Sequence, residues 1–381
     1  MRFFQLFVCM TATVMLFTEC KKGNTVNDGV LSINNSSESQ EVAFEDVATD
    51  IRIVPLISDE PLGCSTQIKC YGSTTLIVST DLYTLYFFED GKLTAKLNKP
   101  GRGRGEYNFI SEFVYSPERK IVYVLNSSRI LKYSVPDMEY LGMIEHPNML
   151  KIAEHDDSTL ICLMTSPEDQ PGIYFINANN GKVSGKLKDV NGLSFMMTSD
   201  LSYYTPNHRI LAQTGSINTI SEVAADINGG EDIILSFDFG KDGMPAKFDS
   251  INGNTSMDFL MEYGQYLNDH RETIVTEVSK VMANDKSISF WYHSGLVGYN
   301  HYCRITDGQV VTYQGFKASG TKGFILPNGL TDGGQYVTLV DQLPETMFDD
   351  SGNRSEFTSQ LEKAMNAQSS NNPVLIFYSI K

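Results

Sequence analysis

The stretch Tyr86-Phe87-Phe88-Glu89-Asp90-Gly91-Lys92 predicts a β-strand that turns back sharply into a second strand. Asp-Gly suits a two-residue hairpin because both central residues of such a turn need a positive φ. The same pattern of aromatic strand, turn and return strand recurs over residues 174–182 and 302–309. Two further copies have their turns at Pro136-Asp137 and at Asp242-Gly243. The sequence therefore contains an internal repeat of hairpins, which indicates an all-β fold.

The spacing of these turns is close to that of propeller blades. The first three turns, at positions 91, 137 and 181, lie 46 and 44 residues apart, and propeller repeats run about 40–50 residues. The later turns, at 242 and 308, follow after gaps of 61 and 66 residues, which leave room for insertions such as an amphipathic helix over 258–267. A second helix is expected over 356–367. The period alone fits six or seven blades.

The two ends of the repeat predict how the ring closes. Residues 51–56 have the pattern of a strand without a hairpin partner before it, and residues 373–380 form an isolated apolar strand at the other end. Pairing the first strand with the last would cover both open sheet edges. We therefore expect an all-β β-propeller over residues 46–381, closed by pairing of its N- and C-terminal strands and carrying short helical insertions.

Charge and cysteine content restrict the classes of function. The net charge is −16. Affinity for nucleic acid depends mainly on Lys and Arg that neutralise phosphates, so no nucleic-acid partner is expected. No Cys-x-x-Cys pair occurs, which argues against a zinc ribbon. Cys64 and Cys70 could form a disulfide, but a strand between them would carry Cys70 away from Cys64, and we favour free, buried thiols.

The start of the chain predicts export. Arg2 precedes an apolar stretch over residues 3–17, which is shorter than the ~20 residues of a membrane span and fits a secretory signal. Leu16-Phe17-Thr18-Glu19-Cys20 then resembles a bacterial lipobox, in which the signal is removed just before a cysteine that receives lipid, although Glu19 stands where a small residue is usual. An ordinary secreted protein is the alternative. We expect a signal peptide over 1–19, lipid on Cys20 and a flexible tether over 20–45.

Three segments resemble a known protein family. They are Ile53-Val54-Pro55-Leu56, Lys99-Pro100-Gly101-Arg102-Gly103-Arg104-Gly105-Glu106-Tyr107 and Asn372-Pro373-Val374-Leu375-Ile376. Together they resemble bacterial six-bladed β-propeller lipoproteins, NHL-like propellers of largely unassigned function, in which proline often stands at the position of Arg104. The resemblance implies six blades and a lipid-anchored location at the bacterial cell envelope, on the outer membrane or the periplasmic face. Because the role of the family is unassigned, the resemblance implies no catalytic residue.

The glycine-rich segment is the most distinctive candidate for a binding site. It lacks the Gly-Lys-Ser/Thr ending of a phosphate-binding loop, and Glu106 stands where a dinucleotide fingerprint needs a third glycine. The candidate ligand-binding residues are Arg102, Arg104, Glu106 and Tyr107. The two arginines could hold an anionic or hydroxylated ligand at the mouth of the central channel, and Tyr107 could add a stacking face. In the alternative interpretation, Glu106 and Tyr107 anchor the next strand and both arginines stay solvated.

Two weaker patterns suggest metal binding. His293 and His301 flank a glycine-containing turn that could bring them together, although two surface histidines are the commoner outcome. Residues 349–353, Asp-Asp-Ser-Gly-Asn, lack the ligand spacing and the closing Glu of a calcium loop and are expected to form a turn. We therefore expect no metal, no cofactor and no catalytic residue.

These observations favour an envelope-anchored, non-catalytic β-propeller that binds a ligand or acts as a scaffold. The expected partner is a glycan, a peptide or an envelope protein, and the membrane is contacted through the lipid anchor only. The alternative is a propeller enzyme, a lyase or hydrolase acting on glycans or peptides, with its site at the channel mouth. A cluster of carboxylates or histidines at that mouth would favour the enzyme.

Overall fold

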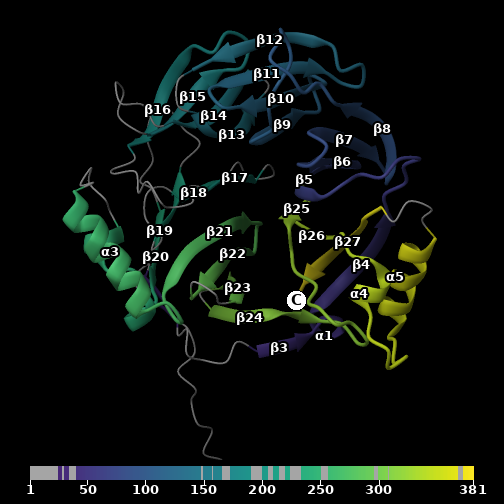
Figure 1. Cartoon of the computed structure of the whole chain (residues 1–381), viewed down its shortest axis with the longest axis vertical. Helices are drawn as coiled ribbons and strands as arrows, with labels where there is room; N and C mark the ends of the chain where they lie inside the picture. The colour runs from purple at the N-terminus through teal and green to yellow at the C-terminus, as the bar shows by residue number, and fades with distance from the viewer. Residues whose placement is uncertain are drawn as a thin grey trace, which may run out of the picture.

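The computed structural model shows a six-bladed β-propeller arranged around a central axis (Figure 1). It describes residues 25–27, 30–33, 40–146, 149–156, 158–164, 172–189, 200–204, 209–213, 219–223, 233–249, 256–295, 299–307, 309–367 and 372–381. Among these residues, no helix is both long and apolar enough to cross a membrane. The signal peptide and the lipidated Cys20 that the sequence predicts lie outside the described residues.

Each blade has four antiparallel strands, of which the first lies nearest the axis (Figure 1). Blades I and II comprise β5 (Ser65–Tyr71), β6 (Thr74–Ser79), β7 (Thr84–Glu89), β8 (Lys92–Leu97), then β9 (Glu112–Ser116), β10 (Ile121–Asn126), β11 (Arg129–Ser134) and β12 (Tyr140–Glu145). Blades III and IV comprise β13 (Met149–Asp156), β14 (Thr159–Met164), β15 (Gly172–Asn177), β16 (Val183–Asp189), then β17 (Asp200–Tyr204), β18 (Arg209–Gln213), β19 (Thr219–Val223) and β20 (Ile233–Asp238). Blades V and VI comprise β21 (Val275–Ala283), β22 (Ser287–Ser294), β23 (Tyr299–Thr306), β24 (Gln309–Lys317), then β25 (Gly329–Leu330), β26 (Tyr336–Val340), β27 (Val374–Ile380) and β4 (Ala48–Pro55).

The hydrophobic core lies between neighbouring blades, because the sheets pack face to face. Phe87 of blade I and Phe113 of blade II are both fully buried in one such cluster. The central strands have apolar side chains on both faces, as a sheet covered on both sides requires. This packing explains why β6, β7 and β10 are runs of buried residues rather than alternating ones.

The predicted hairpins occupy equivalent places in four blades. Asp90 and Gly91 have φ values of 46° and 79° and join β7 to β8. The turns at 137, 181 and 307 likewise join the third strand to the fourth in blades II, III and V. The repeat is thereby confirmed in these blades.

The prediction of a hairpin at Asp242-Gly243 is wrong. The chain forms a short 3-10 turn there, η2 (Gly240–Asp242), in which Gly243 N donates to Gly240 O at 3.2 Å. This turn follows β20, the last strand of blade IV, so the chain is leaving the blade at this point. Asp-Gly suits the end of such a turn as well as a hairpin, and the β19–β20 turn lies outside the described residues.

The first and last strands pair as predicted. β27 runs antiparallel to β4, with Val374 opposite Pro55 and Ile380 opposite Ala48. Val374 and Ile376 are fully buried. The last blade is therefore built from both ends of the propeller, which closes the ring.

The helices are insertions at the ends of blades. α3 (Met257–Asp269) follows α2 (Ala246–Asp249) between blades IV and V, and α4 (Pro344–Met347) and α5 (Glu356–Asn366) lie between β26 and β27. Ser355 caps α5 by accepting a hydrogen bond from Thr358 N, and Leu361 and Met365, four residues apart, face the core. Both helices predicted from periodicity are confirmed.

The segment before the ring is paired with two blades, unlike the flexible tether expected over 20–45. β2 (Val30–Ser32) runs parallel to β20 of blade IV, and β3 (Gln40–Ala43) runs parallel to β24 of blade V, just before α1 (Phe44–Val47). β1 (Thr25–Asn27) lies between β2 and β24 in the sheet and pairs with both. Leu31 and Ile33 are 0% and 2% exposed. We call β1–β3 the N-terminal strap, because these strands join the outer edges of blades IV and V.

The four cysteines of the propeller are free in the structure. Cys70, Cys162 and Cys303 are buried, as expected, whereas Cys64 is exposed. Burial raises the pKa of Cys70 to about 12, so its thiol stays protonated and inert.

Candidate functional site

The glycine-rich loop over 98–111 connects β8 of blade I to β9 of blade II. Its backbone and side chains contact the outer hairpin of blade II. Lys99 Nζ donates to Met138 O at 2.6 Å, and the Tyr133 hydroxyl donates to Gly105 O at 3.1 Å. Residues 99–107 of the loop therefore lie at the junction between the outer strands of blades I and II, away from the channel mouth where the sequence placed them (Figure 1). The loop then runs inward, and its last residue, Ser111, contacts Gln67 of β5 and Leu125 of β10.

Hydrogen bonds within the loop hold its shape. Gly101 N donates to Tyr107 O at 2.9 Å, and Tyr107 N donates to Lys99 O at 3.1 Å. Gly103 N donates to a carboxylate oxygen of Glu106 at 2.7 Å. Gly101 has a φ of 157°, which strains any residue with a side chain, and a Cβ there would displace the Glu106 carboxylate. The loop is thus ordered by its own residues.

Glu106 and Tyr107 have structural roles in this loop. Tyr107 is fully buried, and its hydroxyl lies 2.9 Å from the carbonyl oxygens of both Tyr83 and Leu97. Burial raises the pKa of Tyr107 to about 12. The Tyr107 ring is therefore not exposed as a stacking face. This matches the alternative interpretation, in which Glu106 and Tyr107 anchor the following strand.

The two arginines face solvent on this ordered loop. Arg102 is exposed, and within the described residues its side chain has no hydrogen bond or ion pair. Arg104 is also exposed, and its guanidinium lies 5.9 Å from the centroid of the Tyr140 ring on β12. Cation–π contacts at exposed sites are weak, about 0.5–1 kcal/mol, so Arg104 remains free to bind an anion.

Two exposed aromatic residues that were not predicted from the sequence lie in or beside the same loop. Phe109 is part of the loop and is 43% exposed. Tyr83 is 45% exposed, has a φ of 49°, and is tied to the loop through the Tyr107 hydroxyl. A left-handed conformation is uncommon for a bulky residue and draws attention to the site. No local motif marks Tyr83, because its exposure depends on contacts with residues further along the chain.

Ionic side chains from the innermost strands of three blades meet near the axis. Lys69 of β5 and Lys151 of β13 lie 2.8 and 3.4 Å from the two carboxylate oxygens of Glu112 on β9. Burial opposes ionisation of Glu112, but the two lysines outweigh it and hold its pKa below the usual range. This network joins blades I, II and III, and spatial pairing of this kind has no signature in the sequence.

His293 and His301 come close to one another, as predicted from the turn between them. They lie on the paired strands β22 and β23, where His301 is opposite Tyr292. His301 is buried, stacks on the Tyr292 ring at 4.7 Å, and has its Nε2 2.8 Å from Ser294 Oγ. Among the residues described by the structure, no three His, Cys, Asp or Glu side chains are grouped so that they could hold a metal ion.

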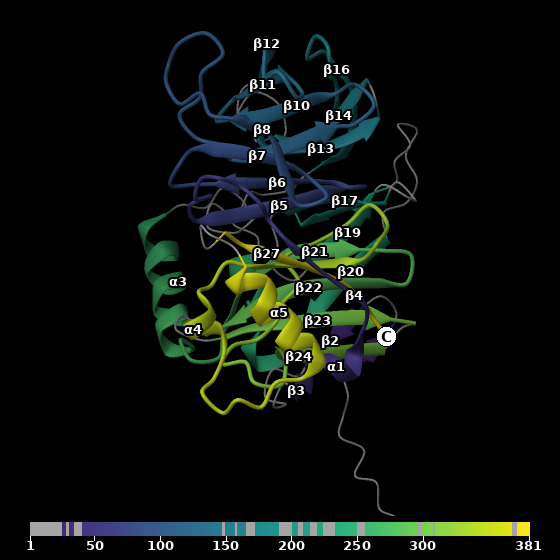
Figure 2. The ribbon, with the colours of Figure 1, turned by 90° about the vertical axis from the view of Figure 1, so that its right-hand side faces the viewer.

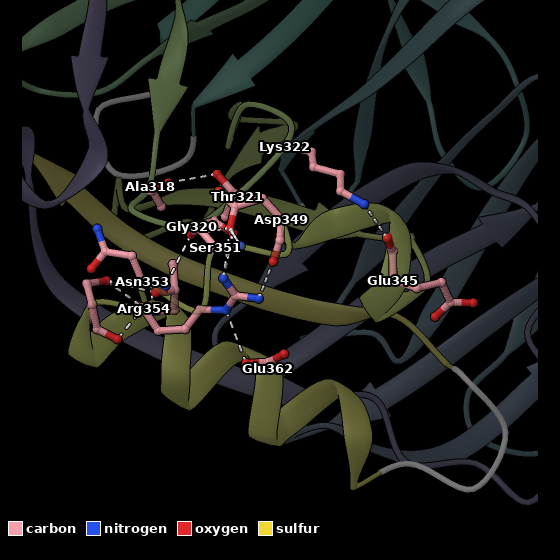
Figure 3. A network of polar contacts seen from close by, with 12 residues as sticks. Ala318, Gly320, Thr321, Lys322, Glu345, Asp349, Ser351, Asn353, Arg354 and Glu362 are labelled. Carbon is pink, nitrogen blue, oxygen red and sulfur yellow. Dashed lines mark hydrogen bonds and ion pairs between the residues drawn. The ribbon is translucent and has the colours of Figure 1, made fainter.

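The acidic segment at 349–353 forms the expected turn. Asp349 Oδ1 accepts hydrogen bonds from Ser351 N at 3.0 Å and from the Ser351 hydroxyl at 2.6 Å. The Arg354 guanidinium lies 3.2 Å from the same oxygen and also contacts Glu362 of α5 and the carbonyl of Gly320 (Figure 3). The Asp349 carboxylate is thus occupied by this network, which fastens α5 to the loop before β25.

A small pocket of about 320 Å³ lies beside the end of β27, and Arg304, Thr306 and Tyr313 of blade V are among its lining residues. The Arg304 guanidinium donates to the carbonyl oxygens of Lys381 at 2.6 Å and of Ile380 at 3.1 Å. Arg304 therefore fastens the closing strand of blade VI to blade V, and its position has a structural explanation.

Comparisons with known proteins agree with this fold. A protein of Bacteroides fragilis described as exported is 17% identical, with a TM-score of 0.65, and the match covers 92% of this chain and 99% of that one. A member of the DUF4221 family from Bacteroides vulgatus is 9% identical, with a TM-score of 0.51, and the match covers 88% of this chain and 98% of that one. Identities this low support the fold alone. No curated protein is significantly similar in sequence.

The family assignment rests on the sequence itself. Residues 29–379 match the family described as a domain of unknown function, DUF4934. The match begins within the N-terminal strap and ends in β27, so it includes all six blades. The chain is therefore a six-bladed β-propeller that belongs to the DUF4934 family.

Proposed function

We propose that this protein is an exported lipoprotein whose propeller binds an anionic partner through Arg102 and Arg104 without catalysing a reaction. The lipid would be carried by Cys20, at the end of the apolar stretch over residues 3–17. The exported Bacteroides fragilis protein with a similar fold supports this location at the cell envelope. The partner would be a glycan, a peptide or an envelope protein that carries carboxylate or phosphate groups.

The observation that carries this proposal is the internal hydrogen bonding of the glycine-rich loop over 98–111, which we call the arginine loop. Fixing the backbone of a flexible residue costs about 1–2 kcal/mol, and a glycine-rich loop would lose that amount for each residue ordered on binding. Hydrogen bonds of Gly101, Gly103 and Tyr107 already hold the loop in place. A ligand therefore meets two arginines on a backbone that needs no further ordering, and their guanidinium groups match carboxylate and phosphate in shape.

Binding to an array of anionic and neutral glycans and phosphopeptides tests the proposal. The double variant Arg102→Ala with Arg104→Ala should fold normally, because neither side chain supports the core. We expect it to bind the anionic partner about tenfold more weakly or worse, since a hydrogen bond to a charged group contributes about 1.5–3 kcal/mol.

The matched control removes the same charge elsewhere. Lys182→Ala with Lys241→Ala changes two exposed lysines, on the β15–β16 turn of blade III and just after β20 of blade IV. This variant should bind as the unmodified protein does. An equal loss of binding in both double variants would show that net charge matters and the arginine loop does not. Unchanged binding in both would remove the arginine loop from the site. Turnover of an arrayed ligand would support the enzyme instead.

A further inference from the structure

We infer that the N-terminal strap turns blades IV and V toward the membrane, so that the arginine loop faces away from it. The anionic partner is then a molecule outside the membrane and not a lipid headgroup of the membrane that holds the protein. This inference rests on the proposed lipid at Cys20 and specifies which source of anionic groups the loop can reach.

The strap fixes the point at which the chain leaves the propeller. β2 pairs with β20 over Val30–Ser32, and Ile33 N continues the pairing by donating to Asp238 O at 2.8 Å. Leu31 and Ile33 are buried in the core shared by blades IV and V. β1 is also paired, since Thr25 lies opposite Ser32 of β2 and Gln309 of β24, so the length of chain between a lipid on Cys20 and the first paired residue ends at Thr25 and not at residue 45.

The arginine loop lies on the other side of the ring. In a ring of six blades, the junction of blades I and II is opposite the junction of blades IV and V. Figures 1 and 2 agree, because β12 lies at one end of the long axis and β3 at the other in both views. Arg104 lies over Tyr140 of β12, which places the loop at the end opposite the strap.

The chain from Cys20 to Thr25 is too short to let the protein turn over. Five residues span at most about 18 Å when fully extended. A compact domain of this length has a radius of gyration of about 20 Å and is about 50 Å across. With β2 paired and the lipid in the membrane, the junction of blades I and II cannot be the edge nearest the lipids.

Net charge disfavours a flat arrangement, in which all blades would lie equally close to the membrane. The chain carries a net charge of −16. Anionic lipids give a membrane surface a negative potential that repels such a chain. An edge-on arrangement brings less of the acidic surface near the lipids while keeping the strap close to its anchor.

Energy transfer to a labelled membrane tests this orientation. In a background with the exposed Cys64 replaced by Ser, a donor dye is attached at Asn108→Cys in the arginine loop or at Lys241→Cys beside β20. The lipidated protein is inserted into vesicles of phosphatidylethanolamine and phosphatidylglycerol that contain an acceptor-labelled lipid. We expect severalfold greater transfer from position 241 than from position 108. Inserting a long Gly-Ser segment after Asn24 should reduce the transfer from position 241.

Each outcome separates the orientation from the anchor. One outcome is that the lipidated protein floats with vesicles, loses that flotation on Cys20→Ser, and still shows equal transfer from both positions. That result would overturn the orientation and leave the proposed lipid anchor standing. Flotation unaffected by Cys20→Ser would overturn the anchor and the orientation with it. High transfer from position 108 that is lost when Arg102 and Arg104 are replaced by Ala would show that the loop binds phosphatidylglycerol. The partner would then be a lipid headgroup, and the orientation would be overturned.

Discussion

Neighbouring residues of one loop can have unlike roles because burial differs from one position to the next. Glu106 binds the backbone of its own loop, and Tyr107 is fully buried with its hydroxyl at Tyr83 and Leu97. Arg102 is exposed a few residues away. Because these residues are contiguous in the motif, the sequence predicts a single binding site that includes all of them. The structure divides them into two that build the loop and two arginines that are free to bind.

The buried His301 makes the free energy of unfolding depend on pH. Burial, together with the nearby His293, lowers its pKa from an ordinary value of about 6.5 to about 4. Between these values the unfolded chain binds a proton that the folded protein excludes, so the free energy of unfolding falls as the pH drops through this window. We expect this residue to contribute a loss on the order of 1–3 kcal/mol. Urea unfolding near pH 7 and near pH 4.5 measures it.

Other groups also titrate in this range, so the test needs a comparison. His301→Gln retains a polar atom that can reach the Ser294 hydroxyl, which lies 2.8 Å from His301 Nε2. The variant should lose less stability than the unmodified protein over the same pH interval. Parallel curves for the two proteins would mean that His301 is protonated equally well in the folded state.

At the scale of strands and helices, prediction from sequence worked where a local signal decides the structure. Asp90-Gly91 requires two positive φ values, and α5 has a cap at Ser355 and apolar residues four apart. It failed at Asp242-Gly243, where the same dipeptide ends a 3-10 turn. The dipeptide indicates a turn in both places. Whether that turn leads back into the same blade as a hairpin depends on which strand of the blade precedes it.

The N-terminal strap was missed for a related reason. Its strands are only three or four residues long and lie in a polar stretch. Their pairing partners, β20 and β24, are about 200 residues or more away in the sequence. Leu31 and Ile33 are too few to give a periodic pattern, and they become informative only when the open edge of blade IV is known.

The strap should contribute measurably to stability. Leu31 is fully buried, and replacing it with Ala leaves a cavity beside the core of blades IV and V. We expect Leu31→Ala to lower the free energy of unfolding by about 2–4 kcal/mol. Val30→Ala is the matched control, because Val30 is the neighbouring residue on the same strand and is 41% exposed. If both variants unfold at the same urea concentration, the strap is not docked.

At the scale of the whole molecule, the number of residues per blade and the apolar last strand were enough to predict a closed propeller. The contacts near the axis were not predictable. Glu112 meets Lys69 and Lys151 because three blades converge there, and the three residues are separated by about 40 residues each. Only the ring geometry brings them together. The arginine loop was assigned to the channel mouth for the same reason, because the sequence does not reveal how far from the axis a connection lies.

Because β27 closes the ring, its deletion should disrupt the fold. Deleting residues 374–381 would expose the edges of β4 and β26, remove buried apolar residues and leave Arg304 without its two carbonyl partners. Open strand edges favour association with other chains. We expect the truncated protein to aggregate or to lose cooperative unfolding in urea, whereas an intact melting transition would contradict closure.

A cross-link across the same pair of strands tests closure without damaging the core. Thr49 of β4 lies opposite Ser379 of β27, and both are only partly buried. Thr49→Cys with Ser379→Cys, in the background lacking Cys64, should form a disulfide on oxidation. That bond closes a loop of about 330 residues, and long loops stabilise most, by about 2–5 kcal/mol. The oxidised form should unfold at a higher urea concentration than the reduced form of the same variant. If both cysteines react with a thiol reagent but no disulfide forms on oxidation, the two side chains do not meet as this pairing requires.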